Sequence, residues 1–401
     1  MGIPPARRSP HERTPTTAPG GPVPILPAPA SARLRFGHRL RHWREARGLS
    51  QAELGRRLGY DDSLISRVEN ARRWPPPGLP GRADELLRTG GELAALWQPV
   101  RQERERFDVL GPSAGPAAVP DGATLDVLSH LLTVYRAATT RIGGEELTAV
   151  LEHHTRTLAG RQRDARRDTD RIRALAARYA ELAGWAHFDG ARPARALAWY
   201  GCGLAWARAA GDRAAASDLL ARQSSVHWWR GDAPAALALA HAARAAARPL
   251  PGAQAWAAIA EAHAHALAGA APESLRALDD AERLTEEALR AAEPGPWLAR
   301  AHLVLTVAHG TCRRDLAHRT GSTGHAHAAV AHLTTALTQL PPSTHPHDHA
   351  LVTARLAAVH ARTGEPDTAT ALLAHLPPAP TGRIAHEHHQ ASALLSYTRA
   401  T

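Results

Sequence analysis

The sequence predicts an all-α protein in which a small domain of short helices precedes an α-solenoid of helical hairpins. Aromatic residues make up 4% of the 401-residue chain and 31 prolines interrupt it, a composition that serves β-sheets poorly. Near the N-terminus, apolar residues recur three and four positions apart, as on one face of a helix. In the second half, turn glycines recur about every forty residues, which indicates stacked hairpins.

Composition divides the chain into four segments. Residues 1–32 carry nine prolines among small residues and cannot bury enough apolar surface to offset ordering, so we expect a disordered arm. Residues 33–109 have helical periodicity and form the predicted small domain. Residues 110–123 lack periodicity and are rich in Pro, Gly and Ala, as expected of a linker. Residues 124–401 are rich in Ala and Leu and form the predicted repeat region.

The small domain begins with two helices whose ends are marked in the sequence. The first runs from Leu34 to near Gly48. Ser50 and Glu53, three residues apart, form a capping box at the start of the second helix. Gly59 is expected to end it.

A third helix is expected to open at Asp61 or Asp62. Its apolar residues Ile65 and Val68 are spaced to face the core. Two further short helices, around 82–88 and 92–97, complete a domain of five.

The second and third helices carry a family resemblance. Residues 34–74 resemble, without a gap, the helix-turn-helix of the phage repressor and Cro family of bacterial regulators, also called the xenobiotic-response-element (XRE) family. The match lies in Arg44–Gly55, Gly59 and Ser63–Asn70. It implies a five-helix lambda-repressor-like domain in a sequence-specific transcriptional regulator. One departure is Gly55, where the family usually has Ala, and we expect it to make the second helix slightly less stable.

Charge supports a double-stranded DNA operator as the partner. Residues 33–73 contain eleven arginines and five acidic residues, an excess of six positive charges in a chain of net charge +10. Arginine concentrated in this way is typical of surfaces that contact DNA phosphates. The alternative is a helix-turn-helix that contacts only protein, as in some antitoxins. It would leave this charge without a role.

The third helix is expected to read DNA with its outer face, which carries Asp62, Ser63, Ser66 and Arg67. Arg67 can make a bidentate contact with guanine, and the two serines can reach bases or phosphates. Asp62 either caps the helix, the preferred interpretation, or accepts a hydrogen bond from cytosine.

Other roles follow from the resemblance. Gln51 matches the family position whose side chain contacts a phosphate, and the flanking Arg72 and Arg73 are expected to contact phosphates of any sequence. Arg44 and Glu69 match a partly buried ion pair between the first and third helices. We prefer this to separate surface charges because a lone buried charge is costly. One recognition helix contacts few base pairs, so a homodimer on DNA is expected.

The repeat region is similar to tetratricopeptide repeats (TPRs), most clearly at Gly231 and Asp232 followed by Ala236 and Ala243. Prolines suited to first helical turns recur at intervals of 41, 38 and 94 residues, so a hairpin without its proline is expected to restart near Gly321. These prolines are Pro193, Pro234, Pro272 and Pro366. The interval exceeds the 34 residues of a TPR. Together, the two regions look like single-copy regulators common in actinobacteria.

Tryptophans are expected on the first helices of successive hairpins, which line the concave groove of such solenoids. They are Trp185, Trp228, Trp229, Trp256 and Trp297. Core packing is the preferred role for any single one, whereas the array favours a groove that binds a ligand. The repeat region is thus either a receptor for a peptide or small-molecule effector, or a platform for dimerisation and protein contacts.

Enzymatic activity is not expected. All 48 basic residues are arginine, which removes the P-loop, Schiff-base and kinase lysines. No nucleophile elbow or dinucleotide loop is present, and no cofactor is expected. The two cysteines argue against a disulfide framework. With no signal peptide and no membrane span, a cytoplasmic protein without membrane contact is expected.

Histidine is dense late in the chain, at residues 345–349 and 386–389. Imidazole and carboxylate at such spacing can bind zinc or nickel, and the second cluster partly resembles a zincin motif. Gln390 stands where the final histidine of that motif is required. We therefore prefer solvated loop histidines and expect no metal site.

Overall fold

The computed structural model describes residues 32–110, 121–161, 169–292 and 297–400. Within these ranges every regular element is helical, which confirms the predicted fold class. The predicted disordered arm lies, apart from Ala32, outside the described residues, and so do residues 111–120 of the predicted linker.

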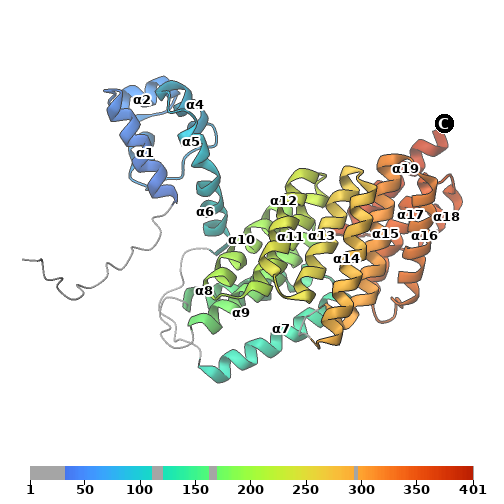
Figure 1. Ribbon diagram of the computed structural model, residues 1–401. Coiled ribbons are helices and arrows are strands. Elements are labelled where there is room, and N and C mark those ends of the chain that lie inside the picture. The colour runs from blue at the N-terminus through green and yellow to red at the C-terminus, as the bar shows by residue number, and fades with distance from the viewer. Residues whose placement is uncertain (1–31, 111–120, 162–168, 293–296, 401) are drawn as a thin grey trace, which may run out of the picture. The chain divides into compact units, whose positions relative to one another are not determined.

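The chain forms two compact units, residues 1–103 and 104–401, here called the N-terminal unit and the C-terminal unit. The N-terminal unit holds α1 (Ala32–Ala46), α2 (Gln51–Leu58), α3 (Asp62–Glu69), α4 (Leu79–Leu87), α5 (Glu92–Ala95) and the first part of α6 (Trp97–Leu110) (Figure 1). Its core includes Phe36, Leu40, Leu54, Ile65 and Val68, all buried. Apolar residues spaced three and four apart therefore converge from α1, α2 and α3, as the periodicity predicts.

The C-terminal unit consists of α7 (Gly122–Ile142), η1 (Glu145–Leu147), α8 (Thr148–Arg161), α9 (Thr169–Asp189), α10 (Pro193–Ala209), α11 (Arg213–Trp229), α12 (Ala233–Ala247), α13 (Pro251–Ala268), α14 (Ala271–Arg290), η2 (Leu298–Arg300), α15 (Ala301–Thr320), α16 (Thr323–Thr338), α17 (Pro346–Arg362), α18 (Pro366–Ala374) and α19 (Gly382–Ala400). From α9 to α18, consecutive helices pair as antiparallel hairpins (Figure 1). The turns explain this pairing: Gly231, Gly269, Gly321 and Gly364 all have positive φ, which glycine adopts without steric cost. Gly321 ends α15, so the hairpin predicted to restart there is α15–α16.

Small residues allow close packing in three of the hairpins, α11–α12, α13–α14 and α17–α18. Ala236, Ser274 and Ala369, five residues after their turn glycines, are fully buried and allow close helix packing. The hydroxyl of Ser274 donates a hydrogen bond of 2.9 Å to the carbonyl of Ala262 on the partner helix. The four prolines noted in the sequence lie at the first or second positions of α10, α12, α14 and α18, where no helical N–H partner is lost.

The first and last helices of the C-terminal unit, α7 and α19, pack against the same two helices. α19 packs against α17 and α18 and also contacts α9, while α7 packs against α17 and α9. This arrangement brings side chains from distant parts of the sequence onto one surface.

Candidate functional site: the α2–α3 surface and the inner face of the repeats

The turn between α2 and α3 is fixed by local hydrogen bonds. Ser50 caps α2 by accepting from the backbone N–H of Glu53, and Gly59 ends the helix with φ 71°. The backbone N–H of Tyr60 then donates to the carbonyl of Gly55 at 2.8 Å. A Cβ at residue 55 would lie 2.7 Å from the carbonyl oxygen of Tyr60, closer than real contacts allow.

Two expectations about this motif are corrected. Gly55 was expected to weaken α2, but the closeness of the Tyr60 carbonyl makes glycine the residue that fits. Asp62 was expected to cap α3, but the cap is Asp61, whose carboxylate accepts from the backbone N–H of Leu64. The side chain of Asp62 is exposed on the first turn of α3, and its Oδ1 accepts from the N–H of Ser63 at 2.8 Å.

The outer face of α3 carries the residues expected to read bases. Ser63 and Arg67 are exposed and Ser66 is half-buried. Nε of Arg67 donates to the carbonyl of Ser63 at 3.1 Å, and its Nη2 donates to Oγ of Ser63 at 2.8 Å. The side chain is 46% exposed, and its guanidinium lies along the N-terminal turns of α3, the part of a recognition helix that contacts base edges.

Arg72 and Arg73 lie in the turn after α3, beyond Asn70 and Ala71, and are exposed. Their backbone N–H groups donate to the carbonyl of Arg67 at 2.7 and 3.2 Å. The backbone carbonyl of Arg67 thus anchors the backbone of Arg72 and Arg73. The turn that holds Arg72 and Arg73 is therefore fixed to the C-terminal half of α3.

Arg44 and Glu69 form a bidentate ion pair between α1 and α3. Nε and Nη2 of Arg44 lie 2.6 and 3.0 Å from the two carboxylate oxygens of Glu69, which is fully buried. Gln51 also donates to Glu69, at 2.8 Å, and Arg41 lies 3.4 Å away. The amide of Gln51, expected to contact a phosphate, is therefore engaged with the carboxylate of Glu69.

The tryptophans predicted to line a groove do not all lie on first helices of hairpins. Four of the five tryptophans lie on first helices of hairpins, as expected: Trp185 on α9, Trp228 and Trp229 on α11, and Trp256 on α13. Trp297 is not on a helix: it directly precedes η2, and its ring packs 5.6 Å from that of Trp256. The expectation that Trp297 belongs to a first helix is wrong because α15 begins only after η2.

The tryptophans at the ends of α9 and α11 face the protein's own last helix. His386 of α19 packs on Trp229, with ring centroids 4.5 Å apart. Arg383 of α19 lies over Trp185 at 6.0 Å and over Phe188 at 4.9 Å. We call the surface formed by Trp185, Asp189, Trp229, Arg314 and Arg355 the inner face. α19 contacts the inner face with its first turns.

Charged residues hold α19 in this position. Glu387, 3% exposed, accepts from Nη1 of Arg314 on α15 at 2.8 Å and from Nε of Arg355 on α17 at 3.0 Å. Burial opposes the charge on Glu387, but these two arginines hold its pKa below its usual range. Arg314 also pairs with Asp315, which accepts from Nε1 of Trp228 at 2.8 Å.

A second buried charge cluster lies on α7 and the first two hairpins. Glu181 of α9 pairs with Arg136 of α7 at 2.6 Å and with Arg222 of α11 at 3.0 Å. Burial disfavours the ionised form of Glu181, but the two arginines keep its pKa below the usual range. Arg222 also lies 5.0 Å from the ring of Trp256, within cation–π range. The indole of Trp256 is thus engaged with a cation of the same chain.

The two late histidine clusters do not converge on a ligand-binding point. His347 pairs with Asp189 at 3.0 Å, whereas Nδ1 of His349 bonds the carbonyl of Leu340 at 2.7 Å. In the second cluster, His386 packs on Trp229 and Glu387 is engaged with arginines. The expectation of solvated loop histidines is therefore wrong for His347, His349 and His386, which contact other residues of the C-terminal unit, whereas His389 is exposed.

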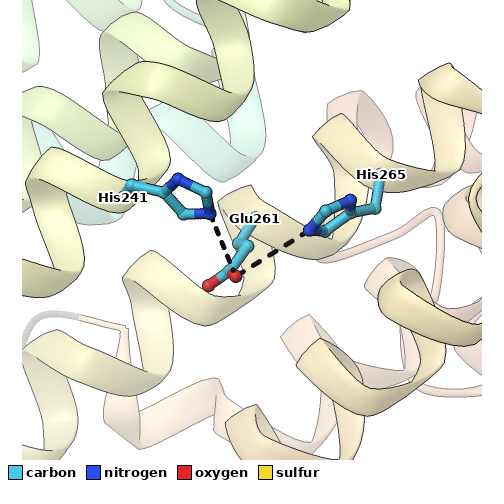
Figure 2. A group of neighbouring side chains, drawn as sticks. All are labelled: His241, Glu261 and His265. Atoms are coloured by element: carbon cyan, nitrogen blue, oxygen red, sulfur yellow. Dashed lines mark ion pairs between the residues drawn. The ribbon is translucent and has the colours of Figure 1, made fainter.

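One cluster was not singled out in the sequence. Figure 2 shows His241 of α12 beside Glu261 and His265 of α13. One ligand atom from each lies within 4.8 Å of the others. Glu261 and His265 are four residues apart and so share a helix face. This spacing can be recognised in the sequence. His241 joins them only through the packing of consecutive hairpins.

Comparison with known proteins supports a helix-turn-helix domain. A family model described as a helix-turn-helix domain matches residues 35–97. No curated protein matches the chain significantly. Among solved structures, the chain is similar to Bacillus thuringiensis PlcR in complex with the peptide PapR7 and DNA, at 12% sequence identity and a TM-score of 0.33. That alignment covers 79% of this chain and 98% of the PlcR chain. Among the described residues, no helix has the length and apolar character to cross a bilayer.

The chain therefore carries an N-terminal helix-turn-helix domain, followed by a unit of helical hairpins.

Proposed function

We propose that this protein is a sequence-specific transcriptional regulator that binds operator DNA through α3. The observation that carries the proposal is the position of Arg67, exposed on the outer face of α3 and held by Ser63. An arginine there can reach the two acceptors of guanine in the major groove. Arg72 and Arg73 would contact phosphates next to it. The alternative, a motif that contacts only protein, leaves these arginines without an anionic partner.

The regulator is proposed to bind as a homodimer. A single helix of eight residues contacts too few base pairs to select one genomic site. Two copies related by a two-fold axis would read half-sites about 34–36 Å apart. The proposal assigns no catalytic reaction to the chain.

Selection from random duplex DNA tests this function. The full chain is incubated with a random duplex library, and bound sequences are amplified, sequenced and footprinted. We expect an inverted repeat, with a two-to-one complex by light scattering. Recovery of no enriched sequence at physiological salt would contradict DNA recognition. Enrichment of an unpaired half-site with a one-to-one complex would contradict the dimer.

The C-terminal unit is proposed to be a receptor whose effector competes with α19 for the inner face. Arg383 and Glu387 of α19, four residues apart, pair with Asp189 and Arg355 of the inner face. A peptide with a basic and an acidic residue four positions apart would offer the same groups. Such an effector alters DNA binding only if its affinity differs between the DNA-competent and incompetent states.

Purification from the native host tests the receptor against a platform for dimerisation. We expect a co-eluting peptide or small molecule, identified by mass spectrometry, which changes operator affinity when added to effector-free protein. The platform is favoured if nothing co-elutes and if removal of residues 104–401 abolishes dimerisation while half-site contacts remain.

A further inference from the structure

His241, Glu261 and His265 converge between two consecutive hairpins. Nε2 of His241, on α12, lies 3.4 Å from Oε1 of Glu261 on α13. Nε2 of His265 lies 3.9 Å from the same oxygen (Figure 2). α12 belongs to the second hairpin and α13 to the third. Three side chains with nitrogen and oxygen ligand atoms therefore meet where the two repeats pack.

The distances agree with a tetrahedral metal site. Zinc bonds of about 2.0–2.1 Å place neighbouring ligand atoms about 3.3–3.4 Å apart. The separation between His241 and Glu261 already has this value, and that between His265 and Glu261 exceeds it by about half an ångström. All three ligand atoms lie within 4.8 Å of one another, so a bound ion would draw them closer together.

The residue types in the cluster suit a metal ion. Two imidazole nitrogens and a carboxylate oxygen are ligands that zinc commonly takes in proteins. Oε2 of Glu261 lies 3.4 Å from Nε of Arg244, which is also paired with Asp280 at 2.9 Å. This contact orients the carboxylate so that Oε1 faces the histidines.

We propose that His241, Glu261 and His265 bind one divalent transition metal ion, with zinc the best match to two imidazoles and a carboxylate. Three protein ligands leave a fourth position for water. His241 is 56% exposed, so the ion can enter from solvent. The bound ion would link the hairpins α11–α12 and α13–α14. Because it binds only the folded chain, it would stabilise the C-terminal unit and fix the angle between these repeats.

Cobalt(II) is the spectroscopic probe for this site. The full chain, without an affinity tag, is titrated with Co²⁺ and followed by its visible absorption, and zinc is then added in competition. We expect one tight site per chain with the absorption of a tetrahedral ion, and loss of that absorption when zinc is added. A rise in the melting temperature with zinc should accompany binding.

Variants decide whether these residues hold the ion. His241→Ala removes an exposed side chain and leaves packing intact, and Glu261→Gln keeps the volume of the half-buried ligand. Each should weaken binding about tenfold or more and remove the thermal shift. His327→Ala, which removes an exposed imidazole from α16, is the matched control and should change neither. The proposal is overturned if the chain shows no tight site, or if His241→Ala and Glu261→Gln bind cobalt as tightly as the control.

Discussion

Arg383, in the first turn of α19, pairs with Asp189, the last residue of α9, at 2.9 Å across 194 residues of sequence. His347 of α17 lies 3.0 Å from the same carboxylate, and the backbone N–H of Gly144 donates to its other oxygen at 2.9 Å. Burial disfavours ionisation of Asp189, but Arg383 and His347 hold its pKa well below the usual range. One carboxylate thus joins the start and the end of the C-terminal unit.

Arg383→Ala should destabilise the C-terminal unit by about 3 kcal/mol. Removing one partner of a buried ion pair leaves the other charge uncompensated, and the remaining bond from His347 places the loss at the lower end of the known range. Urea unfolding of the full chain, followed by tryptophan fluorescence, measures it. Arg276→Ala is the control, since Arg276 is exposed and forms only a surface pair with Glu273. Equal stability of the two variants would contradict the structural role of Asp189.

Arg67→Ala should lose about 1–3 kcal/mol of operator affinity and relax specificity at one base position, because a bidentate contact with guanine is removed. Gel-shift titration against the selected operator and its single-base variants measures both effects.

Arg72→Ala is the matched control, because a phosphate contact weakens all sequences alike and reduces the salt dependence. If Arg67→Ala keeps full operator affinity, Arg67 is not the base reader.

Arg44→Met should destabilise the N-terminal unit by about 3 kcal/mol, because Glu69 is then buried without its bidentate partner. The double variant Arg44→Met with Glu69→Leu should recover most of this loss, since apolar residues of similar volume need no charge partner. Thermal unfolding of both full-length variants measures the difference. A double variant as unstable as the sum of its single changes would argue against a coupled pair.

Gly55→Ala should destabilise α2 by about 1–3 kcal/mol although alanine is the better helix former, because its Cβ would meet the carbonyl of Tyr60. Gly81→Ala, in α4, meets nothing within 4 Å and should instead gain about 0.5–1 kcal/mol. Circular dichroism during thermal unfolding compares the two. A gain in stability in both variants would show that the α2–α3 turn accommodates a side chain.

His263 should make folding stability depend on mildly acidic pH. Burial lowers the pKa of His263 from 6.5 to about 4. The negative charge of Asp315 opposes this shift, and the positive charges of Arg355 and Arg314 add to it. The unfolded chain therefore takes up a proton first, and stability falls as the pH drops from about 6.5 to about 4. Urea unfolding at pH 7 and pH 5 should show a smaller difference for His263→Gln than for the parent chain. All other histidines are common to the two proteins, so the comparison isolates His263. If the loss of stability between pH 7 and pH 5 is the same in both, the burial of His263 is contradicted.

The α2–α3 motif could be predicted because its determinants are local. A cap accepts from an N–H three residues away, and a turn glycine ends the helix that directly precedes it. The exception, Asp61 in place of Asp62, shows where local reasoning fails. Adjacent aspartates are equivalent as caps in sequence, and the register is set by the turn in which Tyr60 bonds Gly55.

The residues of the inner face could be predicted only in part. Helical spacing placed Trp185, Trp229 and Trp256 on first helices, but nothing in the sequence indicated that α19 would cover the inner face. His241 likewise meets Glu261 only when two hairpins pack. In each case the partners lie on different helices, and no periodic pattern reports which helices become neighbours.

The sequence by itself determined the helical class, the helix-turn-helix, the excess of arginine around it and the glycine turns of the hairpins, because each depends on residues a few positions apart or on composition. The tertiary structure alone decided that Asp189 meets Arg383, that Glu387 is buried between Arg314 and Arg355, and that two histidines and a glutamate converge. These contacts arise from the angle at which successive hairpins stack. Small rotations add up over several repeats, so that angle follows from packing of all of them and not from any one segment.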